Sequence, residues 1–522
     1  MEIFLLAKTW KVLCRKVLSF DIRYSFFNNV FLLLFLLVLF TGCKKNLTEL
    51  NVNPNDPLTT DPNYLFRYAL QQGMGNYNSD VTVQQWSIEN WIMYMAARGG
   101  PEPGKEYILP SGKDDLWNEQ YANALANTQA IINLVGDDPE SVNMVAAAMI
   151  WKVYLFQRIT DLWGDVPYSE SLKGISELNL SPAYDSQKDI YYDMLATLKT
   201  AAALFNDKKK FFDPGADLFY QGSMILWIKL ANSLRLRLAT HLNKADYPKY
   251  QQVLQELTGQ PLISSNLESA IFPYNGMVKN HLYETMFRGE SVIQNNPSKF
   301  LADLLVSTND PRVSLILEKA PLSFLPIFPP YNGVPNLLLN TNPLWSNYNR
   351  DGDWGEVSRV GNWFLRNETP GVVMEYAEVC FLKAEAALNG LWPGNAGDLM
   401  KEGVRADIAF YELYGGSAYA LPQEKVDQYL AALPTINLES VITQKWISNV
   451  FENGYESWAD YRRTGYPVLR EYYGNPIDAS LMPVRMTWPY REYTLNQAHY
   501  NEAVVRQGAN NQFTHVWWNR GN

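Results

Sequence analysis

The sequence of 522 residues is poor in the side chains that most often carry catalysis or hold metals. It has three cysteines and four histidines, and no two histidines lie four residues apart. The HExxH and GxSxG patterns are absent, so zinc hydrolysis and serine-nucleophile chemistry have no recognisable carrier. Paired carboxylates for glycoside cleavage stay open, because their separation is a spatial quantity. We expect a protein that is not an enzyme, with an extracytoplasmic glycan-acting enzyme as the less favoured alternative.

The scarcity of cysteine also excludes a disulfide framework. Cys14 precedes the longest apolar run, Cys43 follows it closely, and Cys380 is alone in an apolar helical pattern, where we expect a buried thiol.

Acidic residues outnumber basic ones by 54 to 44, a net charge of −10, which argues against nucleic acid as the main partner. No second long apolar run follows Cys43, so the sequence predicts no membrane-spanning helix in the body.

Ten consecutive large apolar residues occupy positions 31–40. This length suits the hydrophobic region of a signal peptide and is short of the roughly 20 residues of a membrane-spanning helix. The segment before it carries five basic and two acidic residues, and Phe40-Thr41-Gly42-Cys43 resembles a bacterial lipobox. We therefore expect residues 1–42 to be a signal peptide, Cys43 to be lipidated, and 43–61 to be a flexible tether.

Apolar residues recur at helical spacing through much of the remaining chain. The stretch 144–163 is apolar on nearly all sides, which predicts a helix buried between neighbours. The expected fold class is mainly α, with antiparallel helix pairs over about 114–257 and 374–464. A proline-rich, loop-rich region covers about 259–372, and the tail from 466 onward is expected to be loop-rich again. The predicted helices cover 63–74, 117–135, 139–163, 190–205, 227–242, 298–306, 372–390, 396–411, 424–432 and 438–464, with Asp185 or Ser186 capping the helix at 190–205.

Tryptophan and tyrosine are abundant, with 16 and 32 residues. Rigid aromatic rings beside polar groups suit the apolar faces and hydroxyl rims of sugars, and they lose little entropy on binding. Two regions, 77–107 and 331–363, are expected to be loops with this mixture, and at least one of Trp91, Trp345 and Trp354 is expected to stack on a ligand. Aromatics that prove buried would instead favour a structural scaffold without a ligand of its own. The candidate ligand residues are Tyr77, Trp86, Trp91, Tyr107, Tyr331, Trp345, Tyr348, Asp353, Trp354 and Arg359.

One turn carries oxygen ligands that suit calcium, namely Asn349, Asp351, Asp353 and Glu356. Its spacing departs from an EF-hand loop, since Trp354 stands where the sharp turn needs glycine. We therefore favour a solvated turn over a calcium site, and we expect no cofactor and no metal.

Charged residues also occur inside two apolar helical patterns. Glu378 and Glu385 lie in one, and Arg462 and Arg463 lie in the other. A buried carboxylate needs a partner, so the sequence predicts a structural Glu–Arg pair rather than catalysis.

Seven stretches follow the lipobox in order: NVNPNDP (51–57), LWNEQYANALANTQAII (116–132), ITDLWGDVPYSES (159–171), WIKLANSLRLRLA (227–239), YAEVCFLKAEAALNG (376–390), GYESWADYRRTGYPVL (454–469) and MPVRMTWPYREYTLN (482–496). Together they resemble the SusD-like (SusD/RagB) family of outer-membrane nutrient-binding lipoproteins of Bacteroidota. The resemblance spans most of the chain after Cys43.

The resemblance implies one body, 62–522, in which a right-handed tetratricopeptide-like superhelix packs with a loop-rich subdomain. It also implies a lipid-anchored protein on the cell surface, at the outer membrane. Such proteins capture a glycan, or in some members a peptide, and pass it to a SusC-like TonB-dependent transporter. The high aromatic content favours a glycan over a peptide.

Overall fold

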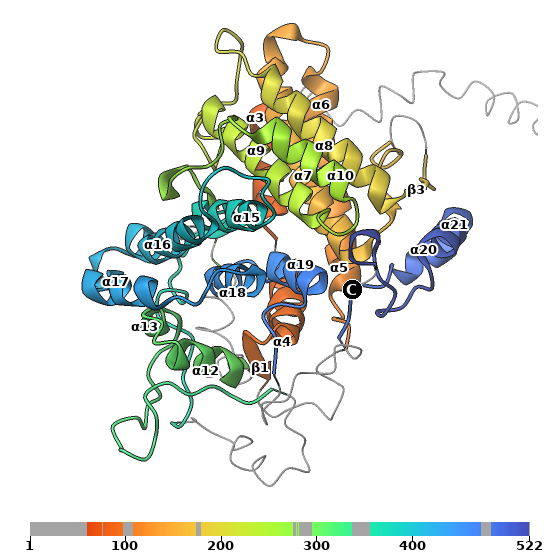
Figure 1. Ribbon diagram of the computed structural model, residues 1–522. Helices are drawn as coiled ribbons and strands as arrows, with labels where there is room; N and C mark the ends of the chain where they lie inside the picture. Colours follow the sequence, from red (N-terminus) through yellow and green to blue (C-terminus); the bar gives the residue numbers. More distant parts are fainter. Residues whose placement is uncertain are drawn as a thin grey trace, which may run out of the picture. The chain divides into compact units, whose positions relative to one another are not determined.

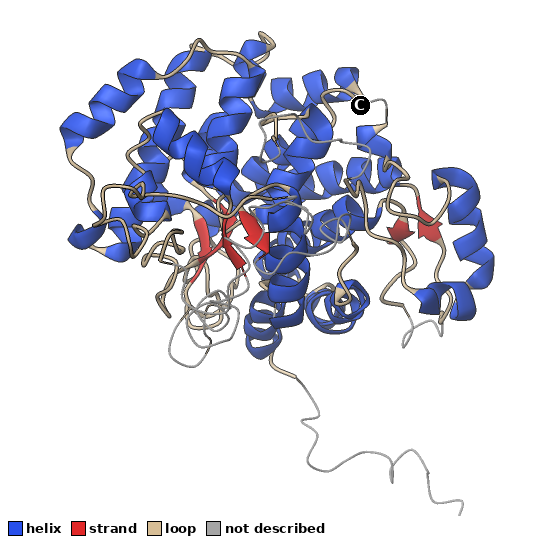
Figure 2. Cartoon of the chain, turned by 90° about the horizontal axis from the view of Figure 1, so that it is seen from below, coloured by secondary structure: helices blue, strands red, loops and turns tan. Residues whose placement is uncertain are grey.

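Helices make up most of the structure, and the strands are few and short (Figures 1 and 2). The computed structural model describes residues 60–97 except 76, 108–173, 179–274, 278, 280, 295–336, 355–470 and 482–520. The chain from Asp61 onward forms one unit. This architecture confirms the predicted mainly α fold. Among the described residues, no helix combines the length and the apolar character that crossing a membrane requires.

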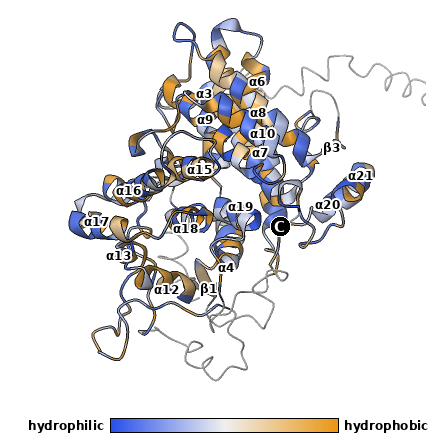
Figure 3. Cartoon of the chain, viewed as in Figure 1, coloured by the Kyte–Doolittle hydropathy of each residue, from blue (hydrophilic) through white to orange (hydrophobic). Residues whose placement is uncertain are grey.

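The first group of helices packs in chain order, with α7 against α6, α8 against α7, α9 against α8 and α10 against α9. Helix α7 is buried on nearly all sides, as its apolar sequence predicts, and hydrophobic residues recur throughout this group (Figure 3). Ser186 caps α8, since its hydroxyl accepts a hydrogen bond of 3.1 Å from the Asp189 N–H. The group consists of α3 (Pro62–Gly73), α5 (Lys113–Glu119), η3 (Gln120–Leu125), α6 (Ala126–Val135), η4 (Pro139–Ser141), α7 (Val142–Trp163), α8 (Gln187–Leu204), α9 (Met224–His241) and α10 (Tyr247–Leu257).

The second group of helices joins the first through α15, which packs against α9 as well as against α16 and α18. Cys380 lies buried in α15, as predicted, and burial raises the pKa of its thiol to about 11. Helix α18 packs in turn against α16 and α19. The group consists of α15 (Tyr376–Leu388), α16 (Ala396–Gly415), η7 (Ser417–Tyr419), α17 (Gln423–Ala432), α18 (Leu438–Ser448) and α19 (Gly454–Thr464).

Three antiparallel pairs of short strands connect distant parts of the chain. β1 (Met95–Ala97) pairs with β5 (Asn295–Pro297), and β2 (Val166–Pro167) pairs with β3 (Tyr184–Asp185). The third pair joins β4 (Ala270–Phe272) to β6 (Gly371–Met374), and Phe272 lies opposite Gly371. Most of the loop-rich region, 273–370, therefore begins and ends at one strand pair. Its described elements are η5 (Asn266–Glu268), α12 (Lys299–Ser307) and α13 (Val313–Ile316).

A fully buried arginine fastens this region to the second helix group. Arg312 precedes α13, and its guanidinium binds Asp310 at 2.6 Å and Asp407 of α16 at 2.8 Å. It also donates to Gln444 of α18 at 2.5 Å. Arginine suits such a position because its planar fork satisfies several acceptors at once.

The structure corrects the loop predicted at 77–107. Residues 77–91 are helical, with a π-helix η1 (Tyr77–Ile88) running into α4 (Glu89–Trp91). A π-helix bonds residue i to i+5, so its side chains do not follow the period of an α-helix. The aromatic residues there consequently show no helical period in the sequence.

Three further predicted boundaries are wrong. Residues 371–374 form β6, not the start of a helix, because strand pairing with β4 overrides their local pattern. The helix predicted over 438–464 is two helices, α18 and α19, separated by a turn at 449–453. The tail contains α20 (Tyr490–Leu495), α21 (Gln497–Gln507) and η9 (Trp517–Asn519), so it is less loop-rich than predicted.

Candidate functional site

The candidate residues from the sequence do not form one described site. Trp86 of η1 is 40% exposed, and Tyr331 and Arg359 are half-buried. For Tyr77 the structure describes the backbone alone, as part of η1. Cys43, Tyr107, Trp345, Tyr348, Asp353 and Trp354 lie outside the described residues, as do Asn349 and Asp351 of the candidate calcium turn.

Trp91 is fully buried, and its ring centroid lies 5.2 Å from that of Trp458 in α19. Its ring packs against α19, and it cannot stack on a ligand unless this contact is broken. Trp91 is therefore a core residue, and that at least one of Trp91, Trp345 and Trp354 stacks on a ligand stays a prediction for the other two, which lie outside the described residues. Its neighbours in sequence are helical rather than loop residues, which is why its ring faces the core.

A cavity of about 100 Å³ lies instead where the two helix groups meet the ends of the loop-rich region. Its wall combines aromatic rings with amide, guanidinium and carboxyl groups. The four candidate ligand residues whose side chains the structure describes, Trp86, Trp91, Tyr331 and Arg359, do not line it. The lining comes from α3–η1 (Met74, Gln84, Gln85), α7 (Tyr154, Gln157, Arg158, Asp161, Leu162), α9 (Arg237), the segments around β4 and β6 (Tyr274, Asn280, Phe364, Thr369, Pro370, Gly371, Val372), and the turn 449–453 with α19 (Phe451, Glu452, Asn453, Tyr455, Glu456, Arg462).

Helix α7 supplies the polar centre of the wall. Gln157, Arg158 and Asp161 are among the few polar residues of this helix, and all three line the cavity. These three polar residues were the sign of a site that the sequence offered. Polar residues inside a helix buried on nearly all sides need hydrogen-bond partners or a ligand. The overall apolar character of the stretch concealed this sign.

The aromatic side of the cavity is held in a fixed arrangement. The Arg158 guanidinium lies 4.7 Å from the Tyr455 ring centroid and donates to the Gly73 carbonyl at 2.9 Å. Gly371 allows Tyr274 to approach, since a Cβ there would lie 2.9 Å from the Tyr274 ring. The Asn280 amide donates to the Thr369 carbonyl at 3.0 Å and closes the same wall. Tyr274 and Tyr455 are therefore held in place at the cavity before a ligand binds.

Two buried oxygen atoms on the wall have no hydrogen-bond partner among the described residues. They are Oε1 of Gln157, a side chain only 3% exposed, and Oε1 of Glu452. A buried acceptor without a donor costs roughly 1–3 kcal/mol. Both residues line the cavity, so it suits a ligand that is rich in hydrogen-bond donors and has apolar faces.

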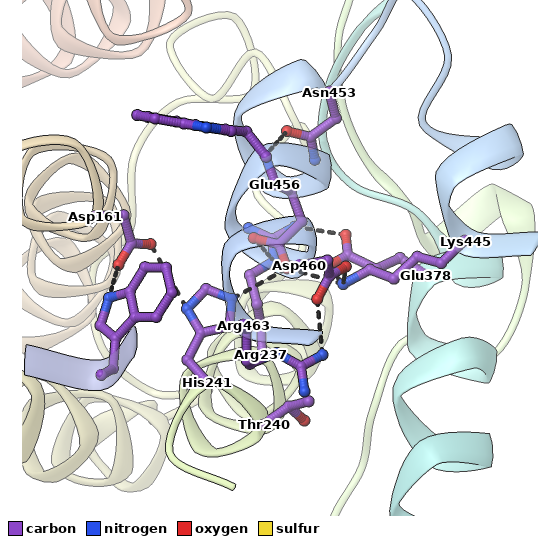
Figure 4. Close-up of polar contacts among 12 residues, drawn as sticks. Asp161, Arg237, Thr240, His241, Glu378, Lys445, Asn453, Glu456, Asp460 and Arg463 are labelled. Atoms are coloured by element: carbon purple, nitrogen blue, oxygen red, sulfur yellow. Dashed lines mark hydrogen bonds and ion pairs between the residues drawn. The ribbon is translucent and has the colours of Figure 1, made fainter. Parts of the chain in front are cut away.

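A network of buried charges adjoins the cavity, and two of its members, Arg237 and Glu456, also line it (Figure 4). Arg237 of α9 binds Glu378 of α15 through two hydrogen bonds of 2.7 and 2.6 Å. Lys445 of α18 lies 2.8 Å from Glu456 and 2.9 Å from Asp460, both on α19. All five side chains are at most 4% exposed. Opposite charges thus compensate one another where four helices, α9, α15, α18 and α19, meet.

The predicted Glu–Arg pair belongs to the same network. Arg463 binds Glu385 through two hydrogen bonds, one of 2.8 Å, and also reaches Asp460 at 2.8 Å. This confirms the prediction. Arg462 instead lies over the Trp458 ring, at 3.7 Å, and donates to the Asp161 carbonyl at 2.8 Å.

His241 links the network to α7 and α8. Its Nε2 lies 3.2 Å from Glu456, and its Nδ1 lies 2.8 Å from the Tyr191 hydroxyl, which donates to Asp161. Burial alone lowers the pKa of His241, but the Glu456 and Asp161 carboxylates outweigh it, so the pKa is raised above 6.5. The imidazole therefore carries a share of the positive charge in this network.

His241, Glu456 and Asp460 are also close enough together to hold a metal ion. The Lys445 ammonium already lies within 2.9 Å of both carboxylates. A metal ion there would meet the repulsion of this charge, so we assign the position to Lys445.

Comparison with known proteins agrees with this architecture. The SusD-like family model described as "Starch-binding associating with outer membrane" matches residues 54–489. A chitin-binding protein of known structure is 27% identical and has a TM-score of 0.75, with 88% of this chain and 100% of that chain covered. No curated protein sequence matches the chain.

Two more solved structures share the fold. A SusD-like protein from Bacteroidetes is 24% identical with a TM-score of 0.76, over 88% of this chain and 100% of its own. A chitin-binding SusD homologue from Flavobacterium johnsoniae is 23% identical with a TM-score of 0.70, over 88% and 99%. The family matched is described by binding and not by a reaction. The chain therefore belongs to the SusD-like family of starch-binding proteins that associate with the outer membrane.

Proposed function

We propose that this protein captures a glycan at the cavity between α7, α19 and the β4–β6 segments, and that it does so without cleaving it. One observation carries the proposal. Aromatic rings of Tyr274 and Tyr455 border a wall on which buried acceptors of Gln157 and Glu452 have no partner among the described residues. Sugars offer both apolar ring faces and hydroxyl donors, which match these two features. Chitin binding by two of the similar structures supports an oligosaccharide ligand.

The proposal includes a place in nutrient uptake. Residues 1–42 direct secretion, Cys43 carries the lipid anchor, and 43–61 tether the body 62–522 to the outer membrane, on the cell surface. The captured glycan then passes to a SusC-like TonB-dependent transporter. Replacing Cys43 by Ala should abolish acylation and release the protein from the membrane fraction. Antibody accessibility on intact cells tests the surface location, and co-purification from detergent-solubilised outer membranes tests the transporter partner.

The binding test uses the chain from Lys44 onward, with affinity electrophoresis on starch and chitin and calorimetry on their oligosaccharides and on peptides. Replacing Tyr455 or Tyr274 by Ala should weaken the affinity by about fivefold or more, the loss expected for one aromatic contact. Tyr64→Ala is the matched control, because Tyr64 on α3 is 72% exposed and does not line the cavity.

The possible results separate the competing functions. Product formation from a bound polymer would overturn the non-catalytic role, and binding of peptides alone would replace the glycan. Equal affinities of the control and the two cavity variants would show that the ligand binds elsewhere. A folded protein that binds nothing on its own, and nothing in complex with a transporter, would favour a scaffold.

A further inference from the structure

Two carboxyl groups meet directly at the edge of the cavity. Glu375 precedes α15, Glu452 lies in the turn 449–453, and their side chains are hydrogen-bond partners. A hydrogen bond between two carboxyl groups needs one proton, because two carboxylates have no donor between them. In each group Oε1 is buried and has no donor among the described residues. The geometry therefore calls for one shared proton.

The surroundings of the pair make its full ionisation unfavourable. Asp407 of α16 and Glu378 of α15 add negative charge near Glu375, and Asp407 also faces Glu452. The phenols of Tyr411 and Tyr414 on α16 complete the titratable neighbours. Burial raises the pKa of Glu452 to about 8, and burial with the Glu452 charge raises that of Glu375 well above its ordinary range.

Two cations in this part of the structure are engaged with other acceptors. The Arg366 guanidinium, which faces Glu452, donates to the carbonyl oxygens of Trp363 at 3.2 Å and Tyr414 at 3.0 Å. Arg312 binds Asp310 and Asp407. Neither hydrogen-bonds to the Glu375–Glu452 pair within the described residues, so the proton is what holds the two groups together.

The turn that carries Glu452 is tightly constrained. Phe451 has a φ of +61°, a conformation that is costly for a bulky side chain, and its ring packs on Phe364 at 5.3 Å. Asn453 caps α19 by accepting from the Glu456 N–H at 3.4 Å. The turn therefore couples the position of Glu452 to the cavity wall on one side and to the charge network on the other.

We propose that Glu375 and Glu452 share one proton, which fastens the turn 449–453 to the start of α15 and keeps Glu452 in place as a ligand-facing acceptor. Loss of this proton makes the two carboxylates repel each other and turns Glu452, now hydrated, into the cavity. Glycan capture then weakens at alkaline pH. The weaker capture at alkaline pH, the second half of this inference, rests on the function proposed above. The shared proton, the first half, does not.

The shared proton is tested without any ligand, by comparing the wild-type chain from Lys44 onward with the double variant Glu375→Gln/Glu452→Gln. Carboxyl groups whose pKa is raised on folding lose protons more readily when unfolded, so their stabilising effect disappears as pH rises from about 4.5 to about 8. The wild type should therefore lose stability relative to the variant as the pH rises across this window. Above the window, the difference in stability between the two should stay constant. Denaturation midpoints at several pH values measure this.

Two controls sharpen the result. Glu424→Gln/Glu439→Gln makes the same two substitutions at exposed positions and should show no such relative change. Infrared spectra at pH 6.5 should contain a protonated-carboxyl band in the wild type that the Glu375→Gln/Glu452→Gln variant lacks. A pH-independent difference, or absence of this band, would overturn the shared proton. Stabilisation by calcium of the wild type alone would overturn it too, by placing a cation between the groups.

Affinity for an oligosaccharide that binds at pH 7 tests the second half. It should fall by roughly tenfold between pH 7 and pH 9, since the protonated fraction changes about tenfold across one unit on either side of a pKa of about 8. The Glu375→Gln/Glu452→Gln variant should bind with little dependence on pH. Equal pH profiles would overturn the coupling to capture. A protein that binds no oligosaccharide at pH 7 would refute the proposed function while leaving the stability test decisive.

Discussion

Glu385 of α15 and Arg463 of α19 form a buried, doubly hydrogen-bonded ion pair, although 78 residues separate them in the sequence. Both side chains are at most 2% exposed. Arg463 also binds Asp460, so its charge is shared by two carboxylates. The pair joins the first helix of the second group to the last one and lies away from the cavity lining. It is thus a contact for stability and not for binding.

Replacing Glu385 by Gln should therefore lower the free energy of unfolding by about 3 kcal/mol, because a buried arginine loses half of its compensation. Ligand affinity of the folded variant should not change. Denaturant unfolding and calorimetry check both parts. Asp303→Asn breaks the exposed Lys299–Asp303 pair and should cost under about 0.5 kcal/mol. Equal losses in the two variants, or lost binding in folded Glu385→Gln, would contradict this account.

The charge of His241 should make stability depend on pH. Its pKa is raised in the folded protein, so its contribution is fully present below about pH 6.5 and disappears as pH rises through the raised value. The difference in unfolding free energy between the wild type and His241→Gln should shrink in that direction. Thermal unfolding at pH steps from 5.5 to 8.5 measures it. A difference that grows with pH would mean that His241 is neutral in the fold.

Gly371→Ala should disturb the cavity more than the helices. The added Cβ would lie 2.8 Å from Met74 Cε and 2.9 Å from the Tyr274 ring, so Tyr274 must shift. We expect a stability loss of about 1–2 kcal/mol and weaker ligand binding. Gly215→Ala is the control, because its Cβ meets nothing within 4 Å. Unchanged affinity in Gly371→Ala would exclude Tyr274 from the ligand contacts.

Cys380 should be inert in the folded protein. Burial raises its pKa to about 11, so almost no thiolate forms at neutral pH, and the side chain is 1% exposed. In the chain from Lys44 onward it is the only cysteine. A maleimide should label it only after denaturation, which mass spectrometry detects. Fast labelling of the native protein would show that α15 opens locally.

The helices could be predicted from the sequence because their apolar spacing is local information. The all-apolar character of 144–163 correctly predicted that α7 is buried on all sides. Trp91 shows the limit: its region has no α-helical period because η1 is a π-helix, so a core residue resembled a loop aromatic.

The cavity could not be predicted, because five segments far apart in the sequence build it. Gln157 and Glu452 stand out only because an oxygen atom of each has no hydrogen-bond partner among the described residues. The local sequence does not show whether such a partner is present. The Glu–Arg pair, in contrast, could be predicted from the sequence. A charge inside an apolar helix face demands an opposite charge, and few candidates were available.

The pairing of Phe272 with Gly371 has a consequence for how relatives of this protein can diverge. Both ends of the segment 273–370 leave the body from adjacent strands, about 5 Å apart. Such a segment behaves as an insertion whose two ends are held at fixed positions. Doubling its length costs only about 0.6 kcal/mol in loop-closure entropy. Evolution can therefore exchange this cassette where the new one keeps an arginine for the buried Asp407, and a chimera that carries such a cassette between Phe272 and Gly371 should fold.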